Sequence, residues 1–483
     1  MQTPVLVGIA QLNQRIDDPN DGKEPYLLML EAVRAAAEDA GSHELLSRVD
    51  SVRVIKGGWR YQDPGRAIAE VIGSPGAETC LTPFGGNFVQ TTMNMSCLDV
   101  QSGKHEVIVI AGAECGNTRA KARRAGFKPQ WSALEGTPDR MIGADAPMMH
   151  PREEALNIIQ PIQVYPILES ALRHHRGQSI DEHLRHISEL WAGFSVVAAG
   201  NPHAWIREAK TAEEIRTPST VNRPVSFPYP KFLNSNNNVD QAAALILTST
   251  EKARALGIAE DKWVYPWVGT NAHDHYFVSN RNNLHSSPAI RFAGTRALEM
   301  AGIQPTDIDM VDLYSCFPVA VQVSAAELGL DPALPWTVTG GMTWGGGPLN
   351  DYVMHSIARM AELLREKPGE RGLVTANGGY ITKHAFGVYS TEPPSEPYRH
   401  EDLQDRVDQT PSRELVDEHF GTAEVEGYTV MYDGDGPAIA YLAARLDDAR
   451  VWGICNDRDT ASAMTTEEFC GRRVTLAGNA ASF

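Results

Sequence analysis

The segments VLVGIAQLNQ (residues 5–14) and VYPWVGTNAHDH (residues 264–275) begin two parts of the chain that follow the same plan. In the first part, this strand-like segment precedes the helical pattern LLMLEAVRAAAEDAG at residues 27–41 and a second strand-like segment. In the second part, about 262 residues later, the helical pattern AIRFAGTRALEMAG at residues 289–302 and another strand-like segment follow in the same order. A strand–helix–strand plan that recurs at a near-constant offset indicates a duplicated domain.

Each copy also contains a later strand of similar character. Residues 107–114 (VIVIAGAE) and 372–379 (GLVTANGG) are both strand-like and both follow helical patterns. Because crossover connections between parallel strands are right-handed, each copy is expected to form a mostly parallel sheet covered by helices. We therefore predict an α/β fold of two similar halves, in which residues 27–41 and 289–302 are equivalent helices.

Four motifs, spread over roughly residues 4 to 390, resemble those of the thiolase superfamily. Residues 234–257 look like its Asn…Asp-Gly-Ala-Ala segment, with Gln241 in place of the glycine. YSCF (314–317), GGGP (345–348) and ANGG (376–379) stand where the family has Asn-Glu-Ala-Phe or His-Asp-Cys-Phe, Gly-His-Pro and Cys-x-Gly. The resemblance implies a duplicated αβαβα thiolase fold, in which residues 115–230 are the loop domain that covers acyl-CoA.

The resemblance also places other residue types at the positions of the thiolase catalytic groups. Gly86 corresponds to the nucleophilic cysteine, Gly347 to the general-base histidine and Ala376 to the second cysteine. Tyr314 corresponds to the asparagine or histidine that orders a water near the thioester oxygen. A Claisen condensation through an acyl-enzyme needs a thiolate and a base within hydrogen-bond reach of it. We therefore expect a thiolase-like protein that is not a conventional acetyl-CoA acetyltransferase.

Residues 401–483 differ in composition from the rest of the chain. They contain 17 acidic residues, 7 arginines and no lysine, and tight Gly/Asp turns separate their short strand patterns. This pattern predicts a small antiparallel β-barrel that follows a Pro-rich linker at residues 387–400. A thiolase-like region with such a barrel resembles the thiolase-like protein type 1 group. The predicted domains are residues 1–260 with the insert 115–230, residues 261–390, and residues 401–483.

Composition predicts a folded, cytoplasmic protein. Its hydrophobic content of 42% and charged content of 22% are ordinary for globular proteins. The net charge of −18 argues against nucleic acid or an anionic membrane surface as a partner. No segment approaches the ~20 apolar residues of a spanning helix, and no signal-peptide pattern is present. The six cysteines lack close spacing, which favours free buried thiols over disulfides or a metal site.

Tyr314 and His384 are the candidate catalytic residues. In the steroid-degrading branch of thiolase-like aldolases, a tyrosine at the place of Tyr314 acts as acid or base in retro-aldol C–C cleavage, and the resemblance implies the same role here. Such a phenol needs nearby donors or a helix N-terminus to lower its pKa. His384 is the only histidine in the motif regions. The alternative for both side chains is a structural role.

Gly85, Gly86, Asn87 and Asn377 are candidates for binding a thioester oxygen. Backbone N–H groups at a helix N-terminus, together with side-chain amides, form an oxyanion or anion site without a nucleophile. The alternative is that the glycines allow close packing against the twin helix.

Arg119, Arg123 and Arg124 are candidates for binding the phosphates of coenzyme A. They belong to the cluster RAKARRAGFK, which holds five cations in ten residues of an acidic chain. Arginine suits phosphate groups because its guanidinium offers several donors. The alternative is a solvated loop.

Several functions remain open from the sequence. The first is an acyl-CoA-binding protein of the acyltransferase family with altered or lost chemistry, which takes a CoA thioester as ligand and has no covalently bound cofactor. The second is a CoA-thioester retro-aldol C–C lyase that uses Tyr314, and the third is a non-catalytic lipid or acyl-CoA-binding protein. A scaffold is a further alternative, because the thiolase-like aldolases pair with a small OB-type subunit. Pairing with a separate enzyme and self-association both stay open.

Overall fold

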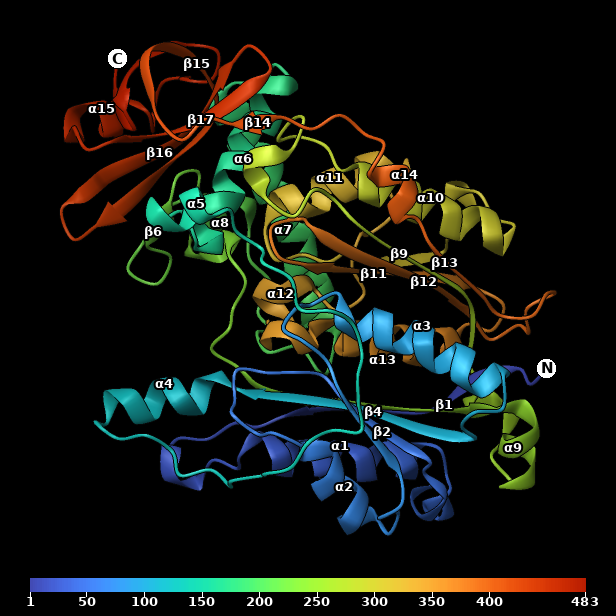
Figure 1. Ribbon diagram of the computed structural model, residues 1–483. Coiled ribbons are helices and arrows are strands. Elements are labelled where there is room, and N and C mark those ends of the chain that lie inside the picture. The colour runs from blue at the N-terminus through green and yellow to red at the C-terminus, as the bar shows by residue number, and fades with distance from the viewer.

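Helices and sheets alternate in five layers in the computed structural model, which describes residues 1–483 (Figure 1). From the bottom of Figure 1 upward these are outer helices, a first sheet, central helices, a second sheet and further outer helices. A β-barrel lies beside the upper layers. No helix of the chain combines the length and the apolar composition that crossing a membrane requires.

The first sheet has the strand order β1-β8-β4-β2-β3-β5. These strands are β1 (Pro4–Asn13), β8 (Asp240–Ser249), β4 (Val107–Cys115), β2 (Ser51–Val54), β3 (Glu78–Leu81) and β5 (Arg140–Met141). Only β8 runs against its neighbours. All residues of β4 and β8 are buried, as expected for strands that helices cover on both faces. The outer helices of this half are α1 (Pro25–Asp39) and α2 (Pro64–Ile72).

The second sheet repeats this arrangement with the strand order β10-β11-β12-β9-β13. Its strands are β10 (Met310–Asp312), β11 (Arg371–Gly378), β12 (Lys383–Ser390), β9 (Tyr265–His273) and β13 (Arg399–Asp402). Its antiparallel strand, β12, corresponds to β8. The outer helices are α10 (Pro288–Ala301) and α11 (Pro318–Leu328), and α10 packs on β9 and β12 as α1 packs on β1 and β8. The predicted duplicated thiolase-type α/β fold is thus confirmed, with residues 27–41 and 289–302 in equivalent helices.

The central layer consists of α3 (Phe88–Gln101) and α13 (Tyr352–Glu366). Each contacts strands of both sheets, and the two helices contact one another. Most residues of α3 are buried, including polar ones such as Gln90 and Asn94. These two amides bond to each other at 2.8 Å, which offsets the cost of removing them from water.

The insert between β4 and β8 contributes five helices and adds strands to two sheets. Its helices are α4 (Gly116–Arg124), α5 (Pro151–Ala155), α6 (Pro161–His175), α7 (Ile180–Gly200) and α8 (Ala212–Arg216). Strand β5 adds to the edge of the first sheet. The short strands β6 (Pro224–Ser226) and β7 (Tyr229–Pro230) join the sheet of the C-terminal barrel.

Five strands close the barrel in the order β15-β16-β17-β19-β18 and back to β15. They are β15 (His419–Asp433), β16 (Gly436–Leu446), β17 (Ala449–Cys455), β18 (Arg473–Gly478) and β19 (Ala480–Ser482). Every neighbouring pair is antiparallel, as predicted, except that β17 and β19 are parallel. A closed barrel of five strands cannot alternate direction throughout, so one neighbouring pair is parallel; the chain reverses from β18 into β19 at Gly478 (φ +71°). A further short strand, β14 (Glu414–Leu415), runs parallel to β17.

The Pro-rich connection to the barrel is shorter than the sequence predicts. Residues 387–390 belong to β12, and residues 399–402 form β13, which extends the second sheet beside β9. Between them the chain is fastened to the sheet, because the Trp267 Nε1–H donates to the carbonyl of Glu392 at 2.8 Å. The region that follows β13 therefore starts from the edge of the second sheet.

A buried arginine joins the barrel to the second half. Arg450, on β17, is fully buried, and its Nη1 donates to the carbonyls of Ser279 and Arg281 at 2.7 Å each. Its other nitrogens pair with the carboxylate of Glu426 on β15, the closest contact being 2.8 Å. One side chain thus bridges two barrel strands and the backbone before α10.

Replacing Arg450 with leucine is expected to lower the free energy of unfolding by about 3–5 kcal/mol, because it leaves a buried carboxylate and two carbonyls without their donor. Urea unfolding followed by circular dichroism measures this change. The matched control is Arg445→Leu, since Arg445 pairs with Glu424 on the exposed surface of the same barrel and exposed pairs contribute little. Equal losses for the two variants would contradict the assignment of Arg450 as the junction residue.

Candidate functional site

A cavity of about 350 Å³ lies where the N-terminus of α3 meets the loop after β10 and the end of β11. Half of its 20 lining residues are hydrophobic, and α6 and the segment before α5 cover it with Tyr165, Met148 and Met149. The lining residues that carry the argument below are Gly85, Gly86, Tyr165, Tyr314, Cys316, Asn377 and Lys383.

The side chain of Tyr314 occupies the space next to Gly86. A Cβ atom on Gly86 would overlap the Tyr314 hydroxyl, and it would lie 2.9 Å from Tyr314 Cζ and 2.6 Å from the carbonyl oxygen of Asn377. Carbon atoms do not approach so closely without displacement. Position 86 therefore has no room for a side chain while Tyr314 holds this position.

The start of α3 offers free backbone donors. The N–H groups of Gly85, Gly86 and Asn87 donate to no protein acceptor, and Asn87 makes no capping hydrogen bond. Unpaired N–H groups and the helix dipole make such a terminus favourable for an oxygen that carries negative charge. The two predicted glycines line the central cavity beside Tyr314.

The phenol of Tyr314 is held by backbone and ring contacts and keeps its proton. The backbone N–H of Tyr314 donates to Thr375 Oγ1 at 2.9 Å, and the Tyr314 ring packs edge-on against the Tyr352 ring, with the ring centroids 5.5 Å apart. The Tyr352 hydroxyl in turn donates to the buried carboxylate of Asp312 at 2.9 Å. Burial, with a smaller effect from Cys316, raises the pKa of Tyr314. The lowered pKa that a base would need is therefore absent, and the geometry suits a hydrogen-bond donor.

The two predicted amides lie in different places. Asn377 lines the central cavity, but its Nδ2 donates to Tyr165 Oη at 3.1 Å, and its Oδ1 is buried without a donor. Asn87 instead lines a neighbouring cavity of about 390 Å³. Its Oδ1 is also buried without a donor.

His384 lies outside the central cavity and lines the neighbouring one. It is on β12, opposite Asn377 of β11 and Ala272 of β9 in the strand register. Burial lowers the pKa of His384 to about 4, although the Asp274 carboxylate 3.9 Å away opposes this shift. The imidazole is therefore neutral at physiological pH, and the structure does not bring it together with Tyr314 at one cavity.

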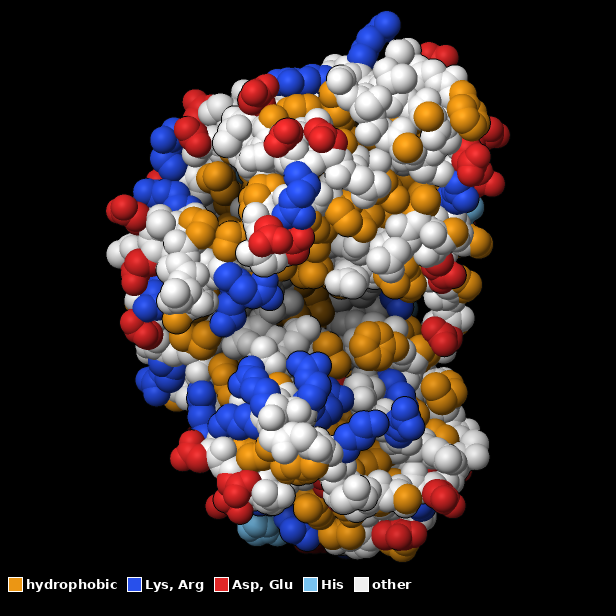
Figure 2. Space-filling model, turned by 90° about the vertical axis from the view of Figure 1, so that its left-hand side faces the viewer, with side chains coloured by type: hydrophobic (Ala, Val, Ile, Leu, Met, Phe, Trp, Pro, Cys, Tyr) orange, Lys and Arg blue, Asp and Glu red, His pale blue; other side chains and the backbone are white.

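The three predicted arginines lie on α4 and are not equivalent. Arg119 is engaged by Glu114 and by the carbonyl of Gly58, each at 2.7 Å. Arg123 and Arg124 are exposed on the last turn and pair with no carboxylate. Figure 2 shows lysine and arginine side chains gathered beside a hollow, on the side of the molecule that carries α4. Of these three arginines, only Arg123 and Arg124 are therefore free to bind an anion.

Lys383 is a cavity residue that the sequence analysis missed. It lines both the central and the neighbouring cavity, and its ammonium group donates to the carbonyl of Phe84 at 3.3 Å. The available signal was a lysine within a buried strand, six residues after Asn377. Cationic side chains are rarely buried unless they are paired, so this position was informative.

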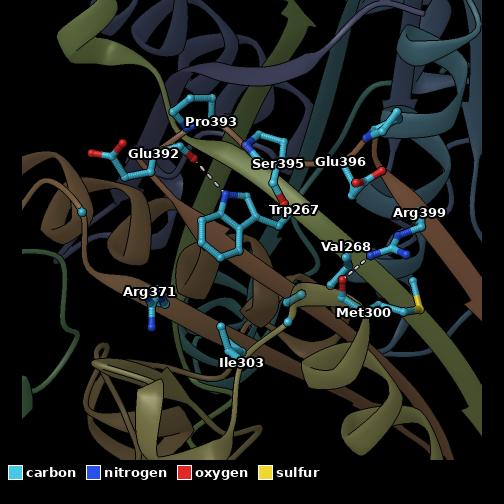
Figure 3. A pocket seen from close by; sticks show the side chains of 15 residues that line it. Trp267, Val268, Met300, Ile303, Arg371, Glu392, Pro393, Ser395, Glu396 and Arg399 are labelled. Carbon is cyan, nitrogen blue, oxygen red and sulfur yellow. Dashed lines mark hydrogen bonds between the residues drawn. The ribbon is translucent and has the colours of Figure 1, made fainter.

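A third hollow, on the edge of the second sheet, is unrelated to these groups. It measures about 300 Å³ and lies between Trp267 and residues 393–397 (Figure 3). Trp267 and Arg399 donate there to the carbonyls of Glu392 and Met300. Trp267 precedes Ala272, which lines the neighbouring cavity, by five residues on β9, so about 16 Å along the strand separates this hollow from the neighbouring cavity. This hollow is therefore the place where the segment after β12 is hydrogen-bonded to the edge of the second sheet.

Two family models match parts of this chain. The model described as "Thiolase-like protein type 1 additional C-terminal domain" covers residues 402–479. The model described as "Thiolase C-terminal domain-like" covers residues 270–333, which include Tyr314.

Curated relatives match about half of this chain or less. An acetyl-CoA acetyltransferase of Methanocaldococcus jannaschii is 24% identical over 49% of this chain and 53% of its own length. A steroid side-chain-cleaving aldolase of Thermomonospora curvata is 25% identical over 38% of this chain and 52% of its own length. The chain thus spans about half the length of these relatives.

A solved structure matches along the whole chain. It is a monomeric SCP2-thiolase like protein type 1 from Mycobacterium smegmatis, with 30% identity and a TM-score of 0.85. The match covers 100% of this chain and 99% of that one, barrel included. Together with the matched C-terminal domain, it shows that this chain belongs to the thiolase-like protein type 1 family.

Proposed function

We propose that this protein binds CoA thioesters in the central cavity and does not carry out the acyl-enzyme chemistry of thiolases. The observation that carries the proposal is the contact between Gly86 and Tyr314. The phenol fills the space that a nucleophilic side chain at position 86 would need. Gly347 and Ala376, at the other two positions that the resemblance assigns to catalysis, have no titratable side chain.

No cysteine near the site replaces the missing nucleophile. Burial raises the pKa of Cys316, which lines the cavity, to about 12. Burial also raises the pKa of Cys97, which lies eleven residues from Gly86 along α3. Because the thiolate is the nucleophilic form, neither thiol is activated at neutral pH.

The remaining features suit a bound thioester. The free N–H groups at the start of α3 can donate to the thioester oxygen. The apolar half of the lining suits an acyl group. Arg123 and Arg124 are free for the phosphates of coenzyme A, about 10 Å along α4 from Gly116, which packs against Asn237 of the cavity lining.

A retro-aldol C–C lyase acting on CoA thioesters is the second candidate, and one observation favours it. The Tyr314 hydroxyl lines the cavity and makes no hydrogen bond to the protein, so it is free for a ligand oxygen. With its proton retained, it would donate to the enolate oxygen that forms when the C–C bond breaks. Because the phenol keeps its own proton, the proton of the β-hydroxyl would pass to water as that hydroxyl becomes a carbonyl. The 25% identical relative named as an aldolase agrees with this candidate.

Acetoacetyl-CoA thiolysis by the wild-type protein is expected to be undetectable, and Gly86→Cys should not restore it, because the new side chain would overlap Tyr314. The same substitution should lower the free energy of unfolding by about 1–3 kcal/mol through overpacking. Thiolysis is followed by the loss of acetoacetyl-CoA absorbance and stability by urea unfolding. Gly193→Cys is the matched control, because a Cβ there meets no atom within 4 Å. Thiolase-like turnover by the wild-type protein would refute the proposal.

Arg123→Ala combined with Arg124→Ala is expected to weaken the binding of butyryl-CoA by about tenfold, since two charge-assisted contacts to phosphate are lost. Isothermal titration calorimetry at low and high salt measures this, and the loss should shrink at high salt because screening weakens the wild-type contacts. Arg34→Ala, on the outer helix α1, serves as the control. Failure of butyryl-CoA to bind the wild-type protein would overturn the CoA-thioester function.

Tyr314→Phe separates the lyase from a binding protein. If the wild-type protein cleaves a 3-hydroxyacyl-CoA, the variant should lose at least about 10²-fold in kcat while it keeps its affinity for acyl-CoA. Chromatography of the CoA products gives the rate. Tyr380→Phe is the control, because the Tyr380 hydroxyl lines the same cavity but donates to the carbonyl of Ile159. An unchanged rate for Tyr314→Phe would rule out this tyrosine as the donor, and wild-type protein that binds without cleavage would be a binding protein.

A further inference from the structure

Lys383 is a buried cation in the wall of the central cavity. Its residue exposure is 8%, and it is the position of β12 at which the central and the neighbouring cavity meet. The ammonium group donates to the carbonyl of Phe84 at 3.3 Å and lies 4.8 Å from the centre of the Phe88 ring. Both contacts orient the ammonium without neutralising its charge.

No carboxylate of the protein pairs with this ammonium. None lies within the 4.0 Å of an ion pair, and Asp145, the acidic residue that most affects Lys383, is an exposed loop residue. An ammonium has three donors, and the protein supplies an acceptor for one of them. Burial accordingly lowers the pKa of Lys383. A buried charge without a counter-charge is costly, so an anion bound in the cavity would stabilise this ammonium.

The surroundings of the ammonium match one chemical class of ligand. A Cβ atom on Gly85 would lie 2.8 Å from Lys383 Nζ, so the cation stands directly beside the free N–H groups at the start of α3. The rest of the lining is largely uncharged, with Phe84, Met148, Phe317 and Met342 among its apolar residues. One cation with a few N–H donors, in an apolar cavity, suits a single negative charge on an apolar molecule. A phosphate group, with a higher charge, would be met by more than one cation.

We propose that the central cavity binds a carboxylate, which pairs with Lys383. Under the function proposed above, on which this reading of the substrate rests, the acyl group of the bound CoA thioester carries the carboxylate at the end remote from the thioester. The thioester oxygen and the carboxylate then use different donors of the same wall, the α3 N–H groups for the first and the ammonium for the second.

The test compares hexanoate with hexanamide, which has nearly the same shape and no charge. Isothermal titration calorimetry on the full-length protein at pH 7.5 is expected to show about tenfold tighter binding of hexanoate, the usual effect of one charge-assisted hydrogen bond. In Lys383→Met this preference should disappear, while hexanamide binds with its wild-type affinity and thus reports an intact cavity. Lys367→Met, which removes a surface lysine of α13's C-cap, should retain the preference.

Three results would overturn the proposal. They are equal binding of the two ligands by the wild-type protein, absence of hexanoate binding, and a preference for hexanoate that survives Lys383→Met. Because neither probe contains coenzyme A, these outcomes are independent of whether butyryl-CoA binds. A carboxylate site without acyl-CoA binding would leave Lys383 assigned and would overturn only the CoA-thioester function.

Discussion

Enclosure of α3 between the two sheets is the constraint on which the rest of the structure depends. The helix contacts strands of both halves, so neither its axis nor its starting point can shift without disturbing both sheets. Its N-terminus consequently projects into the space bounded by the loop after β10 and the end of β11. The sizes of a few side chains then decide which groups this space can hold. A glycine at position 86 and a tyrosine at position 314 share a volume that admits only one side chain.

The same reasoning applies to the parts outside the five layers. The barrel takes β6 and β7 from the insert, and Ser170 of α6 bonds to the backbone of Tyr428 on β15 at 2.7 Å. The insert also covers the central cavity through Tyr165 of α6. Helix α6 therefore contacts both the barrel and the central cavity. The same helix contacts Asn377, whose Nδ2 donates to the Tyr165 hydroxyl at 3.1 Å.

Much of the fold could be predicted because it leaves periodic traces in the sequence. The repeated helices and the buried strands are recognisable from the spacing of their apolar residues, and the resemblance to thiolases assigned Gly86 and Tyr314 to positions of catalytic groups. Contacts between distant residues leave no such trace. Asn377 was expected to face a ligand, yet its donor is engaged by Tyr165, 212 positions away. Lys383 was not predicted because its burial and its lack of a carboxylate partner depend on how distant segments pack around the central cavity. His384, its neighbour in the chain, was chosen for its chemistry and lies in the other cavity.

The contact between Gly86 and Tyr314 also bears on how such a protein can diverge from thiolases. Two positions that compete for one volume cannot change independently. Once a tyrosine occupies position 314, a cysteine at position 86 is excluded by sterics before any question of reactivity arises. Introducing a side chain at position 86 therefore requires a smaller residue at position 314 first, and that step alone leaves an empty space in the core. Any chemistry at this site in the present chain therefore has to accommodate the phenol of Tyr314.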